Sequence, residues 1–169
     1  MRLIVAPACE ARRTCRTARP SHLLRLVSPD QDDDLADLAA DATLTLVMHD
    51  VAEPLAGRIA ASPAMIRALL DFSAGWDGRR PLVAQCWAGV SRSTAAAFII
   101  ACQKRPDLAE RDLAAALRRA SPQATPNRLM VAHADALLAR AGRMTAGIDA
   151  IGRGAEFTSF AAATLDLPA

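Results

Sequence analysis

Apolar residues along this chain fall into short strand-like runs that alternate with longer helical patterns. The strand-like runs occupy residues 3–6, 22–27, 43–48 and 81–86. The helical patterns occupy residues 64–74, 95–102, 108–120, 128–141 and 144–151. Strands that alternate with helices predict an α/β fold, in which a mostly parallel central sheet is flanked by helices.

Residues outside these clear patterns lead to four further expectations. The Arg-rich residues 9–19 form a connection or a short helix, and their charges favour a solvated position. The acidic run at 28–34 favours the positive end of a helix dipole, so we predict that a helix begins there and continues over 35–40. Asp107 is predicted to cap the helix at 108–120. After Gly152 the pattern thins, which predicts one domain over 1–151 and a loosely packed tail over 152–169.

Composition narrows the class of protein. The chain has 169 residues, of which 52% are hydrophobic, enough for one buried core. A net charge of +2 argues against a nucleic-acid partner, and no apolar stretch is long enough for a membrane span. The four cysteines have no metal-binding spacing, so we expect no metal or other cofactor and a reducing, cytoplasmic location. Lys104 is the only lysine beside many arginines, which is typical of a GC-rich, bacterial genome.

The most informative stretch is the strand at 81–86, which is followed by a seven-residue turn and the abrupt start of an apolar helix. Such a turn directs backbone N–H groups and the positive end of a helix dipole at one point, which binds anions. Cys86 opens the turn and Arg92 closes it, so a thiolate is favoured beside a guanidinium that can hold an oxyanion. The predicted phosphate-binding residues are Trp87, Ala88, Gly89, Val90, Ser91 and Arg92.

This Cys-x5-Arg pattern, with Gly89 at its fourth position and Ser93 after the arginine, resembles the signature loop of the cysteine-dependent protein tyrosine and dual-specificity phosphatases. The resemblance extends over residues 3–141, but its specific part is the loop. It implies a single domain with a phosphotyrosine protein phosphatase-like fold. One position departs from the family pattern, because Gln85 stands where the family usually has a histidine that orients the loop and favours the thiolate.

The chemistry of phosphoryl transfer assigns a role to each of these groups. Cys86 is the expected nucleophile, and Arg92 with the loop N–H groups would stabilise the equatorial oxygens of the transition state. Gly89 permits the tight curvature of the loop. Ser93 is expected to donate its hydroxyl to the sulfur and help the thiolate leave; the alternative for Ser93 is a plain helix-start residue.

The resemblance also implies an aspartate, on a separate loop before the cysteine, that protonates the leaving oxygen and later activates water. Asp50 occupies that place, after the strand at 43–48. The alternative is a turn residue at the end of the strand, with His49 and Glu53 as other acids. Asn127 resembles an asparagine that braces the signature loop in the family, and a simple helix cap is the alternative.

The sequence therefore predicts a phosphatase that acts on a phosphorylated protein, above all on phosphotyrosine, or on a small phosphomonoester. The uncharged interior of the loop disfavours phosphoinositides. Gln85 keeps open the alternative of a phosphate-binding pseudophosphatase with little turnover. A rhodanese-like sulfurtransferase or an arsenate reductase is a third possibility, but Cys102 would lie about 24 Å along the helix from the loop, too far for a thiol relay.

Overall fold

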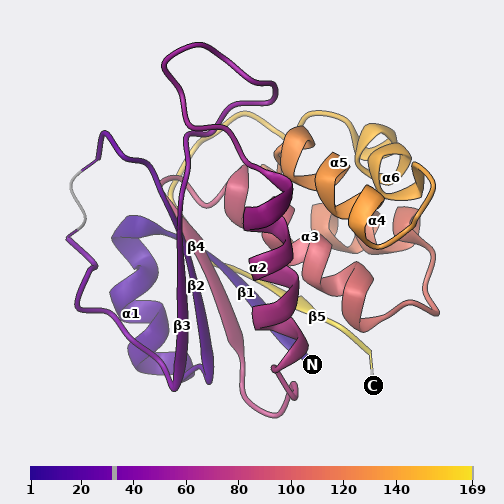
Figure 1. The fold of residues 1–169 in the computed structure, drawn as a ribbon. Helices are drawn as coiled ribbons and strands as arrows, with labels where there is room; N and C mark the ends of the chain where they lie inside the picture. The colour runs from indigo at the N-terminus through magenta and orange to yellow at the C-terminus, as the bar shows by residue number, and fades with distance from the viewer. Residues whose placement is uncertain (32–33, 169) are drawn as a thin grey trace.

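Five strands form one sheet in the order β3-β2-β4-β1-β5 (Figure 1). The computed structural model describes residues 1–31 and 34–168. The strands are Arg2–Pro7 (β1), His22–Val27 (β2), Ala42–Val47 (β3), Leu82–Cys86 (β4) and Ala163–Asp166 (β5). The pairs β1–β4, β2–β4 and β2–β3 are parallel, and only β5 runs antiparallel, beside β1. The predicted mostly parallel sheet is confirmed.

The helices lie on both faces of this sheet (Figure 1). They are Ala8–Ala18 (α1), Pro63–Ala74 (α2), Arg92–Lys104 (α3), Glu110–Ala120 (α4), Arg128–Leu137 (α5) and Arg143–Ile151 (α6). Helix α1 covers one face alone and α2–α6 gather on the other, so the larger core lies on the second side. Within the described part of the chain, no helix has both the length and the apolarity that a membrane crossing requires.

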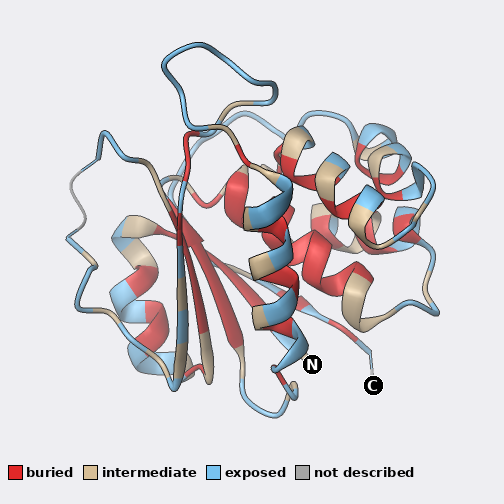
Figure 2. Ribbon diagram, viewed as in Figure 1, coloured by how far each residue is buried: buried red, intermediate tan, exposed pale blue. Residues whose placement is uncertain are grey.

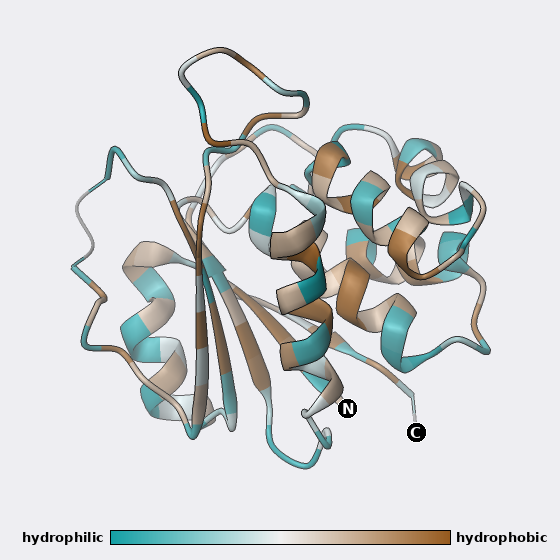
Figure 3. Cartoon of the chain, in the orientation of Figure 1, coloured by the Kyte–Doolittle hydropathy of each residue, from teal (hydrophilic) through white to brown (hydrophobic). Residues whose placement is uncertain are grey.

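Strand β4 and helix α3 form the centre of the larger core. Every residue of β4 is buried, and α3 is buried from Arg92 to Cys102 (Figure 2). Alanines at 95–97 let α3 lie close to the sheet, while Phe98, Ile99 and Ile100 supply apolar volume (Figure 3). The turn between β4 and α3 is therefore held at both ends by the best-packed part of the molecule.

The helix predicted at 35–40 is wrong, because residues 35–37 form a turn and residues 38–40 have no regular secondary structure. The regular helix of this region is α1, which lies between β1 and β2. Its residue Arg12 donates hydrogen bonds to the Asp37 carboxylate and to the Asp34 carbonyl, at 2.9 and 3.1 Å. The backbone around Asp34 is thus used to bind α1. Asp32 and Asp33 of the predicted acidic run lie outside the described residues.

Asp107 is not the cap that the sequence predicted. Helix α4 begins at Glu110 with Ala109 as its N-cap residue. The Asp107 carboxylate instead accepts two hydrogen bonds from Arg105, at 2.9 and 2.6 Å. These bonds lower the pKa of Asp107 to about 2. The Asp107 carboxylate therefore binds the Arg105 guanidinium through two hydrogen bonds instead of capping α4.

The prediction of a loosely packed tail over 152–169 is wrong for its last part. Residues Ala163–Asp166 form β5, and Leu165 and Leu167 are buried. Residues 152–162 before them contain no helix or strand. The chain therefore returns to the sheet and adds an antiparallel edge strand beside β1, in the same layer as the strands of the predicted 1–151 domain.

Candidate functional site

The turn from Cys86 to Arg92, which we name the phosphate loop, stands at the carboxyl end of the central strand β4. Ligands of open parallel sheets bind at this edge, and the sequence predicted this position. Cys86 is the last residue of β4 and pairs in register with Pro7 of β1. Its side chain is 2% exposed, so the thiol lies at the base of the loop.

The phosphate loop packs closely on the end of β1. Gly89 has a φ of 73°, and a Cβ at this position would lie 2.8 Å from the Pro7 nitrogen. A glycine is needed here both for the left-handed backbone and for the close approach. The Ala8 N–H donates to the Trp87 carbonyl at 3.0 Å, which fixes the start of the loop against α1.

Other segments hold the second half of the phosphate loop by its carbonyl oxygens. The Val90 carbonyl accepts from the Thr125 N–H at 2.9 Å, and the Thr94 hydroxyl donates to Val90 and Ser91 carbonyls. No acceptor among the described residues receives the backbone N–H groups of 87–91. The carbonyl oxygens of the loop accept hydrogen bonds from other segments, while its N–H groups remain without acceptors. This is the arrangement that an oxyanion site requires.

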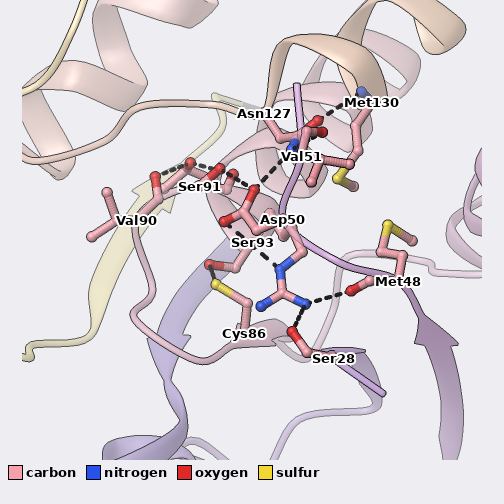
Figure 4. Close-up of polar contacts among 12 residues, drawn as sticks. Ser28, Met48, Asp50, Val51, Cys86, Val90, Ser91, Ser93, Asn127 and Met130 are labelled. Carbon is pink, nitrogen blue, oxygen red and sulfur yellow. Dashed lines mark hydrogen bonds and ion pairs between the residues drawn. The ribbon is translucent and has the colours of Figure 1, made fainter. Parts of the chain in front are cut away.

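Arg92 supplies positive charge beside Cys86. Its side chain is buried, and its Nη1 donates to the Ser28 hydroxyl at 2.9 Å and to the Met48 carbonyl at 2.7 Å (Figure 4). Its Nε has no hydrogen-bond partner within the described residues and lies 3.8 Å from the Asp50 Oδ2. One edge of the guanidinium is thus anchored while Nε stays available for an oxyanion.

Ser93 lies directly against the predicted nucleophile. Its hydroxyl is 3.0 Å from the Cys86 sulfur, and both side chains are buried (Figure 4). Either atom can be the donor, so the hydroxyl can stabilise a thiolate once the thiol has lost its proton. This contact gives Ser93 a polar partner inside the site as well as a place at the start of α3.

Asp50 reaches the phosphate loop from the neighbouring segment after β3. Its Oδ1 accepts from the Ser91 hydroxyl and from the Asn127 side-chain amide, each at 2.8 Å (Figure 4). Asn127 also caps α5, since its Oδ1 accepts from the Met130 N–H at 3.0 Å. Its amide further binds the Val51 carbonyl at 3.0 Å. The Asn127 side chain therefore caps α5 and also braces a neighbouring side chain. The side chain that it braces is Asp50 and not one of the phosphate loop.

Among the described residues, the alternative acids form no hydrogen bond or ion pair with the phosphate loop. We name residues 50–58 the acid loop; Glu53 is exposed in it. His49 is buried, with its Nε2 2.7 Å from the Asp30 carboxylate and its Nδ1 accepting from the Ile59 N–H at 2.8 Å. Arg58 also pairs with Asp30. The hydrogen bond from His49 and then that from Arg58 hold the pKa of Asp30 below its usual value. These four residues, His49, Ile59, Asp30 and Arg58, form a clip that closes the acid loop.

The remaining sulfur and amide groups near the core differ in their environment. Burial, reinforced by the Glu110 carboxylate, raises the pKa of the Cys102 thiol to about 12, so this thiol stays protonated. Gln85 is 3% exposed, and its Oε1 has no hydrogen-bond partner in the described ranges. Among the described residues, no group of three or more His, Cys, Asp or Glu side chains is placed to hold a metal ion.

Sequence reasoning assigned no role to Ser28, and it disfavoured Asp30 as an acid because the dense charge around it implies solvation. Ser28 binds Arg92 directly, and Asp30 belongs to the clip. Both follow β2, which is adjacent to β4 in the sheet. The carboxyl ends of adjacent parallel strands meet at one edge, so the position after the 22–27 run was the available signal.

Two cavities flank the phosphate loop. The larger has a volume of about 700 Å³ and includes Gln85 and Trp87, the neighbours of Cys86. The smaller has a volume of about 390 Å³ and includes Ser28 and Asp50. Gln31 lines both cavities. The larger cavity adjoins the phosphate loop through Trp87, and the smaller adjoins it through Asp50, which accepts a hydrogen bond from Ser91.

Comparison with solved structures identifies the fold. Human tyrosine phosphatase-like serine/threonine/tyrosine-interacting protein matches with a TM-score of 0.59 at 17% identity, covering 82% of this chain and 92% of that one. Human DUSP28 matches with a TM-score of 0.59 at 19% identity, covering 82% and 94%. DUSP15 matches with a TM-score of 0.57 at 17% identity, covering 88% and 90%. This chain therefore has the α/β fold of the dual-specificity phosphatases.

Comparisons of sequence alone find no relatives. No family model matches the chain. No curated protein matches it either. With identities near one fifth, the structural matches establish the fold, and any activity must be inferred from the residues of the site.

Proposed function

We propose that this protein is a phosphomonoester hydrolase, a protein tyrosine phosphatase that works through a phosphocysteine intermediate on Cys86. One observation carries the proposal. The buried sulfur of Cys86 lies 3.0 Å from the Ser93 hydroxyl, at the base of a loop whose backbone N–H groups lack acceptors among the described residues. A nucleophile surrounded by anion-binding donors is suited to attack a bound phosphoryl group.

In the first step, the Cys86 thiolate attacks phosphorus while the ester P–O bond breaks. Arg92 and the N–H groups of 87–91 stabilise the three equatorial oxygens as their charge spreads. Asp50 gives its proton to the leaving oxygen, which departs as an alcohol or a phenol. The products of this step are the dephosphorylated substrate and a phosphorylated cysteine.

In the second step, Asp50 as carboxylate takes a proton from water, and the water oxygen attacks phosphorus. The S–P bond breaks, inorganic phosphate forms and the thiolate returns. Ser93 supports this step because its hydroxyl donates a hydrogen bond to the departing sulfur. Asp50 is protonated again and ready for the next cycle, so no co-reactant beyond water is consumed.

We propose phosphotyrosine in proteins as the preferred substrate class. Trp87, Ala88, Val90 and Ser91 place no charged side chain in the loop, which offers nothing to the additional phosphates of a phosphoinositide. A catalytic thiolate requires a reducing compartment, so we propose a cytoplasmic location.

A second candidate function is a phosphate-binding pseudophosphatase. The observation that favours it is Gln85, an uncharged side chain immediately before the nucleophile, with no hydrogen-bond partner for its Oε1 in the described chain. Such a side chain does not electrostatically favour the thiolate as a protonated histidine does. A protein of this kind would bind phosphotyrosine without turnover.

The test is hydrolysis of p-nitrophenyl phosphate by the wild type and by Cys86→Ser, with a chelator present throughout. The phosphatase proposal requires metal-independent turnover that falls by about 10⁴-fold or more in Cys86→Ser. Acid-quenched enzyme should carry phosphate on Cys86 after mixing with a labelled substrate. Binding of a phosphotyrosine peptide with no turnover by the wild type would establish the pseudophosphatase instead.

A further inference from the structure

The larger cavity beside the phosphate loop, which we name the side cavity, is not used by the chemistry described above. Its lining comes from α1, β2, β4, residues 31, 34 and 35, the phosphate loop and the C-terminal segment. The lining residues are Ala8, Cys9, Arg12, Leu26, Val27, Gln31, Asp34, Leu35, Gln85, Trp87 and Phe160. A volume of about 700 Å³ is in the range of sites that bind organic ligands.

Two aromatic side chains form one wall of the side cavity. The rings of Trp87 and Phe160 meet edge to face with centroids 5.7 Å apart, and Phe157 contacts Phe160 in the same way at 4.7 Å. All three are exposed, with Trp87 at 56%, Phe160 at 42% and Phe157 at 47%. Large exposed aromatic groups gathered beside a reactive loop offer apolar surface to a ligand.

The side cavity also contains a polar group that lacks a partner. Gln85 is 3% exposed, and its Oε1 accepts no hydrogen bond from any described residue. An acceptor buried without a donor costs free energy, which a ligand N–H or O–H would recover. Gln85 precedes Cys86 in β4, so its side chain lies on the α1 side of the sheet, while Trp87 joins the side cavity to the phosphate loop.

The charges at the side cavity favour an uncharged occupant. Arg12 donates hydrogen bonds at 2.9 and 3.0 Å to the two oxygens of Asp37, so its charge is already paired. Asp34 adds an acidic residue to the lining. An anionic group such as a second phosphate would meet a paired arginine and a carboxylate, whereas a neutral apolar side chain would meet no opposing charge.

We infer that the side cavity binds the polypeptide segment next to the phosphorylated residue of a protein substrate. An apolar or aromatic side chain of that segment packs against Trp87 and Phe160, and a backbone N–H donates to the Gln85 Oε1. A peptide provides both groups at once, and the cavity adjoins the loop that holds the phosphate. This inference rests on the proposed phosphatase function and names the feature by which the site selects its substrates.

The kinetic test compares phosphotyrosine peptides that differ only beside the phosphotyrosine, with leucine or phenylalanine in one series and glycine in the other. The wild type should show a KM about tenfold lower for the apolar peptides, with kcat nearly unchanged. Phe160→Ala should abolish this preference and leave p-nitrophenyl phosphate hydrolysis unchanged. Ser159→Ala is the control, because Ser159 is exposed in the same segment but does not line the side cavity.

Cys9 provides a second readout that does not depend on turnover. It lines the side cavity and is exposed, whereas Cys15, Cys86 and Cys102 are buried. In a Cys86→Ser background, an apolar phosphopeptide at saturation should slow alkylation of Cys9 at least fivefold. Inorganic phosphate, which fills only the phosphate loop, should not slow it.

Three outcomes would overturn the inference. They are equal KM values for the two peptide series, equal losses in Ser159→Ala and Phe160→Ala, or a saturating phosphopeptide that leaves Cys9 unprotected. Failure of the proposed function has a different signature. In that case the wild type hydrolyses neither p-nitrophenyl phosphate nor any peptide, while protection of Cys9 still reports whether the side cavity is occupied.

Discussion

The phosphate loop and the acid loop meet at the hydrogen bond between Ser91 and Asp50, yet they are held in different ways. The phosphate loop lies between a wholly buried strand and a helix buried over most of its length, and backbone contacts to β1 and to Thr125 shape it. The acid loop is exposed from 52 to 58 (Figure 2). It is closed mainly by the clip of His49, Ile59, Asp30 and Arg58.

Because the two loops are held differently, the nucleophile and the general acid depend on different parts of the fold. The nucleophile and the oxyanion donors follow from how β4 passes into α3, so they resist small surface changes. The position of the acid depends on a few side-chain hydrogen bonds, so it can be adjusted without disturbing the core. Variants of the phosphate loop should therefore cost much more activity than variants of the clip.

Of the variants considered, Gly89→Ala should lower kcat the most. An added Cβ would lie 2.8 Å from the Pro7 nitrogen, and alanine is strained at a φ of 73°. The loop must shift, and misplacing oxyanion donors costs about 10²–10³-fold in kcat. Steady-state hydrolysis of p-nitrophenyl phosphate measures this loss, and circular dichroism checks that the fold persists. A loss below tenfold would show that the loop adapts more freely than its packing implies.

Asp50→Asn should lower kcat by about 10²-fold with little change in phosphate binding, because it removes the proton donor and leaves the oxyanion donors in place. The loss should grow with poorer leaving groups, so phenyl phosphate suffers more than p-nitrophenyl phosphate. The dependence of kcat on pH should also lose the limb that reports the acid. Equal losses for both substrates would assign proton transfer to another group.

Ser93→Ala removes the hydroxyl that contacts the Cys86 sulfur, and we expect a smaller effect than in the two preceding variants. Loss of a hydrogen bond to the charged sulfur corresponds to about tenfold slower breakdown of the phosphocysteine. Rapid mixing should then show a burst of p-nitrophenol before a slow steady state, since attack is less affected than hydrolysis of the intermediate. Ser93→Thr, which keeps the hydroxyl, is the matched control and should restore the rate.

Arg58→Gln should have the smallest effect, about a threefold lower kcat, because it weakens only the clip. Hydrogen exchange at the Ile59 N–H should accelerate, since this group bonds to the His49 ring. The Asp30 carboxylate has a lowered pKa, so its contribution to the clip is complete above about pH 4 and is lost as the pH falls through the lowered value. The protection of the Ile59 N–H relative to its intrinsic exchange rate should therefore fall below about pH 4 in the wild type.

The phosphate loop could be predicted from the sequence because its parts are contiguous. A strand, Cys86, a glycine suited to a left-handed turn, Arg92 and a helix follow one another within a short stretch. The structure places Asp50 in contact with this loop, as its position after a strand implied. Neighbouring residues determine local geometry, and parallel strands bring their carboxyl ends to one edge.

The clip and β5 could not be predicted because they depend on distant pairings. Asp30 meets His49 and Arg58 across 19 and 28 residues, and charge patterns alone do not select such partners. Strand β5 has only four residues, and its place is set by β1 at the other end of the chain. The misplaced helix at 35–40 has a similar origin, because acidic residues favour a helix start but also bind Arg12.

The pairing of the first and last described parts of the chain has a practical consequence. The Met1 ammonium donates to the Leu167 carbonyl at 3.0 Å, and the Leu167 N–H donates to the Met1 carbonyl at 2.8 Å. In Figure 1 the start of β1 and the end of β5 lie at the side of the molecule opposite the acid loop. A short linker would join them into a ring, and new termini could then be opened at Gly57 in the exposed acid loop. Such a circular permutant would keep the sheet continuous. It would cut the acid loop between Asp50 and the clip residues Arg58 and Ile59.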